Sequence, residues 1–63
     1  MFIVLHDVNE GSSILINTNK LETAYFDGSI RATVVVVGEN SFRVKEHVDS
    51  IKRLIDLNNE KRS

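Results

Sequence analysis

Cysteine is absent from this 63-residue sequence, and it has only two histidines and three glycines. Without cysteine the fold has no disulfide and no thiolate metal site to supplement its hydrophobic core. A chain of this length forms one domain, 1–63, which buries only about 60% of the surface that the unfolded chain exposes. Apolar residues make up 41% of the sequence, which is enough for a small core and predicts a folded domain.

The sequence also lacks a long apolar run. No segment approaches the length of a membrane-spanning helix. The apolar residues 2–5 are followed at once by His6 and Asp7, so they are too short for the apolar core of a signal peptide. We therefore expect a cytoplasmic protein with no membrane insertion. The net charge of −1 gives no overall attraction to nucleic acid or to anionic lipid.

Patterns typical of catalytic or metal sites are missing as well. The three glycines lie in separate predicted turns, so they form no glycine-rich phosphate loop. Neither His6 nor His47 has the spaced partner ligands that a metal site requires. Ser12 and Ser13 have no histidine at a spacing that would indicate an activated nucleophile. We expect a protein that is not an enzyme and that holds no metal or cofactor.

The segment 31–45 carries the clearest structural signal, that of a β-hairpin. It contains four consecutive valines, whose β-branched side chains lose χ1 freedom in a helix and suit a pleated strand. We expect a three-residue loop, 38–40, closed by Asn40 in the left-handed region. With this loop one face is wholly apolar and is the core side: Ile30, Ala32, Val34, Val36, Phe42 and Val44. The opposite face carries Arg31, Thr33, Val35, Val37, Ser41, Arg43 and Lys45.

A two-residue loop at 39–40 is the alternative for this hairpin. It would place Arg43 and Lys45 beside the valines of the apolar face, and we reject it for that reason. In the preferred register Val36 and Phe42 are cross-strand neighbours that face the last helix.

The remaining segments predict three more strands and one helix. Strands are expected at 2–8, 13–17 and 21–26, with turns at 9–12 and 27–29 and a loop or single helical turn at 18–20. The helix has apolar residues at helical spacing, Val48, Ile51, Leu54 and Ile55, and is expected to end at Asn58 or Asn59, with a loose tail at 59–63. The predicted fold is α+β: a small curled antiparallel sheet of about five strands, with an open barrel as the variant, and one C-terminal helix.

Two stretches of the chain resemble the FlbD/SwrD family of small bacterial flagellar and swarming-motility proteins. Residues 14–17 followed by 20–23 are similar to that family's strand, Asn-containing bend and next strand, and 42–51 are similar to its entry into the last helix. His47 stands where the family tends to have a capping serine, and the hairpin loop lacks the family's usual Asn-Gly pair. The resemblance implies a non-enzymatic accessory role near the flagellar motor and brings no catalytic residues.

The predicted faces suggest self-association. Val35 and Val37 on the second hairpin face, with Leu57 at the edge of the helical stripe, are apolar surface that one small core has no room for. We expect a homodimer or higher homo-oligomer that buries these residues, and a protein partner is compatible with the same surface.

The alternative is a nucleic-acid-binding β protein that uses Arg31, Arg43 and Lys45 as phosphate contacts. The strand–hairpin–helix order is similar to the end of LytTR-type DNA-binding domains, but the preceding part and the basic surplus of those domains are missing. A solvated sheet face with scattered charges is the preferred interpretation, because one small stripe falls short of the basic footprint of a nucleic-acid binder. Tyr25 and Phe26 are expected in the core rather than stacked on bases. A phage or mobile-element protein is the third possibility left open.

Overall fold

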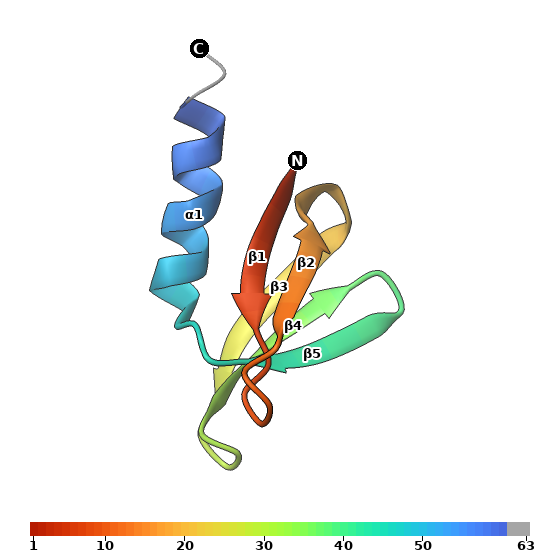
Figure 1. The fold of residues 1–63 in the computed structure, drawn as a ribbon, viewed down its shortest axis with the longest axis vertical. Coiled ribbons are helices and arrows are strands. Elements are labelled where there is room, and N and C mark those ends of the chain that lie inside the picture. The colour runs from red at the N-terminus through yellow and green to blue at the C-terminus, as the bar shows by residue number, and fades with distance from the viewer. Residues whose placement is uncertain (61–63) are drawn as a thin grey trace.

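The computed structural model describes residues 1–60, and its strands and helix follow the predicted order (Figure 1). The strands are β1 (Phe2–His6), β2 (Ser13–Asn17), β3 (Leu21–Asp27), β4 (Ala32–Val37) and β5 (Asn40–Val44). A short 3-10 turn (Thr18–Lys20) links β2 to β3, and the helix α1 spans Val48–Glu60.

Five antiparallel strands and one C-terminal helix confirm the α+β fold. The strands form two sheets, β1–β2 and β3–β4–β5, rather than the single curled sheet expected from the sequence. An isolated bridge between Asp7 and Val44 joins the end of β1 to the end of β5. Beside it, the Lys45 backbone N–H donates to the His6 carbonyl at 2.9 Å. Within residues 1–60 the sheets do not close into a barrel, because β2 and β3 do not pair with each other.

The register of the β4–β5 hairpin differs from the prediction. The loop has two residues, Gly38 and Glu39, and not three. Phe42 therefore pairs with Val35, and the predicted pairing of Phe42 with Val36 is wrong. The hairpin residues that face the core are Thr33, Val35, Val37, Phe42 and Val44. Of the other residues predicted on that side, Ala32, Val34 and Val36 lie on the opposite face, where Ala32 and Val34 are nevertheless buried, and Ile30 is exposed in the turn before β4.

The conformation of the turn explains this register. Gly38 has a φ of +60°, whereas the φ of Glu39 is not positive. This is the sign pattern of a type II′ hairpin turn, which takes glycine at its first central position. The glycine-first dipeptide is the sequence signal for such a turn. A slip of one residue in the loop moves every side chain of β5 to the other face relative to β4, which is why the expected core face was wrong.

We expect Gly38→Ala to lower the free energy of unfolding by about 1–2 kcal/mol, because an L-residue is strained at positive φ. A Cβ at position 38 would meet no atom within 4 Å, so the cost arises from the backbone alone. Gly28→Ala is the matched control, since its backbone is not left-handed and its Cβ would lie 3.9 Å from Phe26, an ordinary contact. Urea unfolding measures both changes. Equal losses in the two variants would contradict the type II′ turn.

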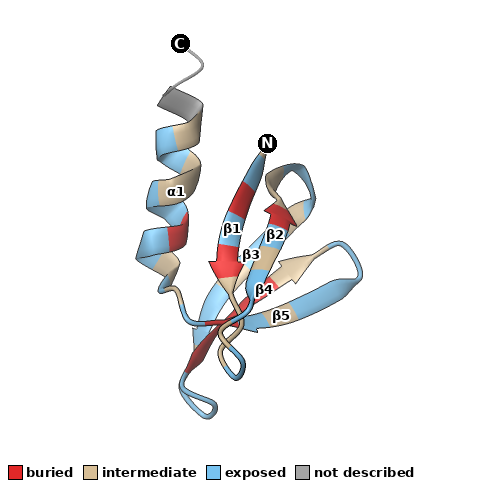
Figure 2. Cartoon of the chain, viewed as in Figure 1, coloured by how far each residue is buried: buried red, intermediate tan, exposed pale blue. Residues whose placement is uncertain are grey.

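The hydrophobic core draws on both sheets and on the helix (Figure 2). Its buried side chains are Ile3, Leu5, Ile16, Val35, Val44 and Ile51. Partly buried side chains pack around these: Ile14, Leu21, Ala24, Val37, Phe42, Leu54 and Ile55. Successive side chains of a strand point to opposite faces of the sheet. In β1, Ile3 and Leu5 therefore point into the core, while Phe2 and Val4 are exposed to solvent.

The predicted apolar stripe of the helix is confirmed. Ile51 is buried, Leu54 and Ile55 pack against the core, and Val48, at the start of the helix, is half-buried. The helix runs to Glu60, past its expected end, and the rest of the expected tail, 61–63, lies outside the described residues. Across the described part of the chain, no helix combines the length and the apolar character that crossing a membrane requires.

Candidate functional site

The residues predicted to form an oligomer face do not lie together on the surface. Val35 is fully buried and Val37 packs against the core, because the two-residue turn directs both side chains inward. Their predicted placement on an exposed face is therefore wrong. Leu57, in contrast, is 49% exposed on α1.

An exposed apolar cluster lies instead on the outside of the β1–β2 sheet. We call Phe2, Val4 and Leu15 the β1–β2 outer surface. Val4 and Leu15 are paired directly across the two strands and are 48% and 64% exposed. Phe2 is 55% exposed and lies on the same face, two positions before Val4. Adjacent exposed apolar side chains of this size are typical of an interaction surface.

The sequence contained a partial signal for this surface. The first strand is apolar at both odd and even positions, so whichever face points inward leaves apolar side chains on the other. It did not indicate which face that is, or that Leu15 on the next strand completes the cluster. These details depend on the antiparallel register, in which Leu15 is opposite Val4.

A second group of exposed apolar side chains lies near the turn between β3 and β4. It consists of Tyr25, Phe26 and Ile30. Tyr25 and Phe26 are consecutive in β3, so they point to opposite faces of the sheet, and both are about half exposed. Their predicted place in the core is therefore wrong. Because the two rings diverge, they form no common platform.

The basic residues of the nucleic-acid alternative are only partly brought together. Arg43 lies opposite Val34 on the outer face of the β3–β4–β5 sheet, and Lys45 follows directly after β5. Arg31 lies apart from the strand ladder, in the turn before β4, with a φ of +52°. The expected stripe is thus reduced to two side chains at the end of β5.

Asp7 places a negative charge near these two side chains. Its carboxylate accepts hydrogen bonds from the backbone N–H groups of Glu10 (3.0 Å) and Asn9 (2.8 Å). These bonds, followed by the positive charges of Arg43 and Lys45, lower the pKa of Asp7. The carboxylate is therefore ionised at neutral pH and offsets part of the positive charge that a phosphate would meet.

His6 and Glu46 join two segments that are 40 residues apart in the sequence. The His6 ring donates from Nδ1 to Glu46 Oε2 at 2.6 Å, and the His6 backbone N–H donates to Oε1 at 2.9 Å. Burial acts to raise the pKa of Glu46, but the two hydrogen bonds from His6, one from the Glu46 backbone and the charge of His6 together outweigh it, and the pKa is lowered. The two hydrogen bonds from His6 connect the end of β1 to the segment that leads into α1.

Acid is expected to destabilise the fold through Glu46. Its pKa is lower in the folded chain than in the unfolded one, so its contribution is complete above about pH 5 and is lost as the pH falls through the folded pKa. Glu46→Gln keeps an oxygen that accepts a hydrogen bond but does not titrate. Its free energy of unfolding should therefore fall less than that of the wild type between about pH 5 and about pH 3.

Urea unfolding across this pH range measures the difference. Asp7 and Asp27, whose pKa values are also lowered by hydrogen bonds, titrate in both proteins and cancel in the comparison. Parallel stability curves for the two proteins would mean that the Glu46 carboxylate contributes nothing.

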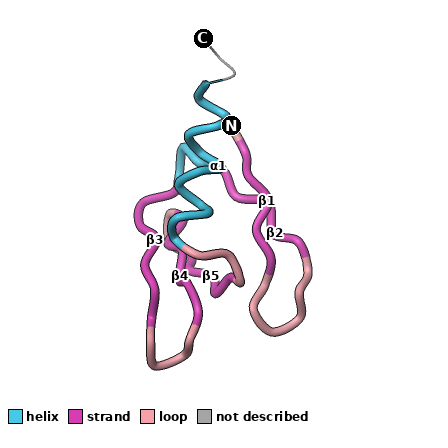
Figure 3. The backbone as a smooth tube through the Cα atoms, turned by 90° about the vertical axis from the view of Figure 1, so that its left-hand side faces the viewer, coloured by secondary structure: helices cyan, strands magenta, loops and turns pink. Residues whose placement is uncertain are grey.

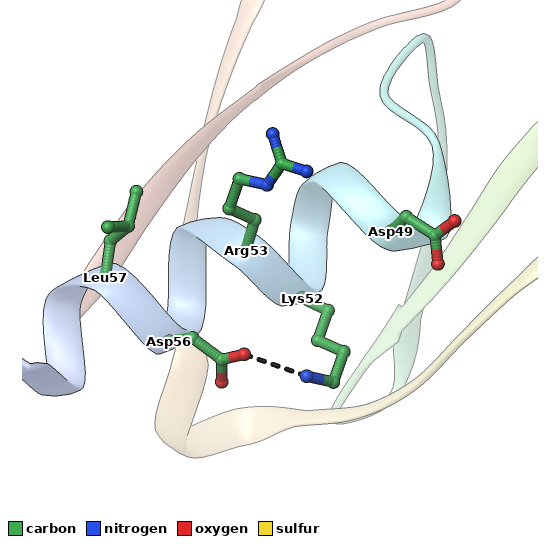
Figure 4. A pocket seen from close by; sticks show the side chains of 5 residues that line it. All are labelled: Asp49, Lys52, Arg53, Asp56 and Leu57. Carbon is green, nitrogen blue, oxygen red and sulfur yellow. Dashed lines mark hydrogen bonds and ion pairs between the residues drawn. The ribbon is translucent and has the colours of Figure 1, made fainter.

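A shallow hollow lies on the exposed side of α1. It is lined by Asp49, Lys52, Arg53, Asp56 and Leu57 (Figure 4). Lys52 Nζ donates to Asp56 Oδ2 at 2.8 Å, one helical turn away, while Arg53 and Leu57 point away from this pair. Exposed ion pairs of this spacing are ordinary features of a solvated helix and contribute little. The hollow offers charge of both signs and one leucine, and no arrangement typical of catalysis.

Comparisons with known proteins give no assignment. No protein family, no curated protein and no solved structure matches the chain. Among the side chains that the structure describes, no three histidines, aspartates or glutamates gather closely enough to hold a metal ion. The functional inference therefore rests on the chain's own surface, above all on the β1–β2 outer surface.

Proposed function

We propose that this chain is a non-enzymatic interaction or assembly module that docks through the β1–β2 outer surface. The observation that supports this proposal is the directly paired, exposed Val4 and Leu15. Water contact with such a pair is unfavourable, at about 25 cal/mol per Å² of apolar surface, and a partner that covers it gains this free energy. Phe2, on the same face, supplies a large aromatic anchor of the kind enriched in interfaces.

We further propose a bacterial motility context for the module, as an accessory to the flagellum. The support for this part is the resemblance of 14–17, 20–23 and 42–51 to the FlbD/SwrD family. In the structure, 14–17 lie in β2, 20–23 lead from the 3-10 turn into β3, and 42–51 lead from β5 into α1. They are thus segments that set the fold, and Leu15 in the first of them also belongs to the β1–β2 outer surface.

Deletion of the gene in its own host, followed by complementation, tests both parts. We expect the deletion to impair swimming or swarming, and the wild-type gene to restore it. Leu15→Lys should fail to restore motility, whereas Leu57→Lys, an equally drastic change at another exposed leucine, should succeed. Normal motility in the deletion strain would contradict the motility context. Full complementation by Leu15→Lys would contradict the assignment of the surface.

A second candidate function is the binding of single-stranded nucleic acid on the outer face of the β3–β4–β5 sheet. The observation that favours it is a row across three strands, in which Tyr25 is opposite Val34 and Val34 is opposite Arg43. The exposed Tyr25 ring and the exposed Arg43 guanidinium, on either side of the buried Val34, can stack on a base and neutralise a phosphate. Asp7, near Arg43, opposes this binding.

Fluorescence anisotropy with labelled single-stranded DNA and RNA separates the two candidates. Binding that weakens steeply with salt and is lost in Arg43→Glu would support the nucleic-acid candidate. The interaction module predicts no binding at low salt by either the wild type or Arg43→Glu.

A further inference from the structure

We infer that two copies of this chain associate by antiparallel pairing of their β2 strands, around a two-fold axis that passes beside Leu15. This inference rests on the proposed function and names a second copy as the partner of the β2 edge, which borders the β1–β2 outer surface. It differs from the self-association expected from the sequence, which placed Val35 and Val37 in the interface.

The strand β2 has a free edge. In the described part of the chain it pairs with β1 alone, while β1 is further tied to β5 through the Asp7–Val44 bridge. Figure 1 shows β2 on the side of β1 that faces away from α1, so the helix does not cover this edge. An edge of this kind presents unpaired backbone N–H and C=O groups that another strand can bind.

Of the other edge strands, β5 carries the charged Arg43 and is bonded at its end to the segment after β1. The free edge of β3 carries features that oppose pairing. Its register is irregular between Leu21 and Thr23, and the charged Glu22 lies at this irregularity. Bulges and charged side chains are the usual means by which proteins prevent the pairing of edge strands. The strand β2 has neither, because its register with β1 is regular and its sequence, Ser-Ile-Leu-Ile-Asn, has no charge. The contrast indicates that β2 is the edge left open to a partner.

The sequence of β2 is complementary to itself. When Leu15 of one copy is opposite Leu15 of the other, Ile14 is opposite Ile16 and Ser13 is opposite Asn17. Ile14 and Ile16 both belong to the inner side of the sheet, so inner side chains meet inner side chains and the pleat is continuous. The absence of charge means that the two-fold axis brings no like charges together. A second copy can therefore pair with this edge without placing an inner side chain opposite an outer one and without bringing like charges together.

The same pairing extends the β1–β2 outer surface. The two sheets become one four-stranded sheet, with Phe2, Val4 and Leu15 of each copy on one face of it. Leu15, the most exposed of these side chains at 64%, gains a leucine neighbour across the axis. Pairing of a five-residue strand is a small interface, so we expect association in a range of about 1 µM to about 1 mM.

Light scattering on the purified chain over this concentration range tests the inference. The mass is expected to rise from the 7.1 kDa of one chain toward twice that value. Leu15→Lys should weaken association at least about tenfold, because a lysine on the edge brings two positive charges together at the axis. Ser13→Lys, at the end of the same edge, is a second variant with the same expected direction, and circular dichroism verifies that each variant folds. Leu57→Lys should associate like the wild type.

A mass of 7.1 kDa at every concentration would overturn the inference, as would dissociation by Leu57→Lys but not by Leu15→Lys. Because light scattering uses the purified chain, its failure is distinct from a failure of the motility experiment, which would instead overturn the proposed function.

Discussion

Leu5→Ala is expected to lower the free energy of unfolding by about 2–5 kcal/mol. Leu5 is fully buried in β1 and belongs to the core between the sheets and the helix. Truncation to alanine removes apolar contacts and leaves a cavity that the surrounding core closes only in part. A domain of this size is stable by a value near the low end of about 5–15 kcal/mol, so the loss would leave a large fraction of the chain unfolded.

Leu15→Ala is the matched control for this change. The substitution is chemically the same and lies on the same two-stranded sheet, but Leu15 is 64% exposed. In a dilute sample we expect a loss of less than about 1 kcal/mol, because little buried surface is removed. Urea unfolding followed by circular dichroism measures both variants. Equal losses would contradict the assignment of inner and outer faces to the β1–β2 sheet.

Ile51→Ala is the second change with a large expected effect, again a loss of about 2–5 kcal/mol. Ile51 is the fully buried side chain of α1 in the part of the chain that the structure describes (Figure 2). The helix lies along one side of the two sheets (Figure 3), and among the strands it approaches β3 most extensively. Without Ile51 the remaining anchors, Leu54 and Ile55, are only partly buried. Alanine has the higher helix propensity, so any loss reflects packing and not the helix itself.

Leu57→Ala controls for the removal of an aliphatic side chain from the same helix. Leu57 is half exposed, and its truncation should change stability by less than about 1 kcal/mol. Chemical unfolding of both variants, with the helical signal as the readout, gives the comparison. If Ile51→Ala were as stable as Leu57→Ala, the helix would be held by contacts other than this side chain.

Local patterns in the sequence predicted most of the secondary structure. The second strand, 13–17, and the apolar stripe of the helix are confirmed, and of the two alternatives for 18–20, a loop or a helical turn, the helical turn is present. Each depends on neighbouring residues: β-branched and apolar runs for strands, and a spacing of three and four residues for the helix. Such patterns are readable without knowledge of the fold.

The faces of the strands were not readable in the same way. The four valines of β4 are apolar at both odd and even positions, so alternation does not distinguish the inner from the outer face. Which face points inward is determined instead by the turn between β4 and β5. There the left-handed Gly38 makes the loop one residue shorter than expected. The strand β1 is also apolar at both odd and even positions, so the exposure of Phe2 and Val4 could not be predicted from alternation.

Contacts between distant segments were also beyond the sequence patterns. The hydrogen bonds between His6 and Glu46 join segments 40 residues apart, and no local spacing indicates them. The pairing of Val4 with Leu15 likewise depends on the register of two strands. The β1–β2 outer surface could therefore be identified only from the structure, in which the two strands lie side by side.

Cross-linking through a single introduced cysteine tests the β2–β2 pairing most directly. The chain has no cysteine of its own, so Leu15→Cys places one thiol at the proposed axis. Facing residues of antiparallel strands have Cα atoms about 4.5–5.5 Å apart, which is within the range of about 4.4–6.8 Å that a disulfide spans. Under mild oxidation Leu15→Cys is expected to form a covalent dimer rapidly, and the exposed control Leu57→Cys is expected to do so slowly. Equal rates for the two variants, or no dimer of Leu15→Cys, would contradict the pairing.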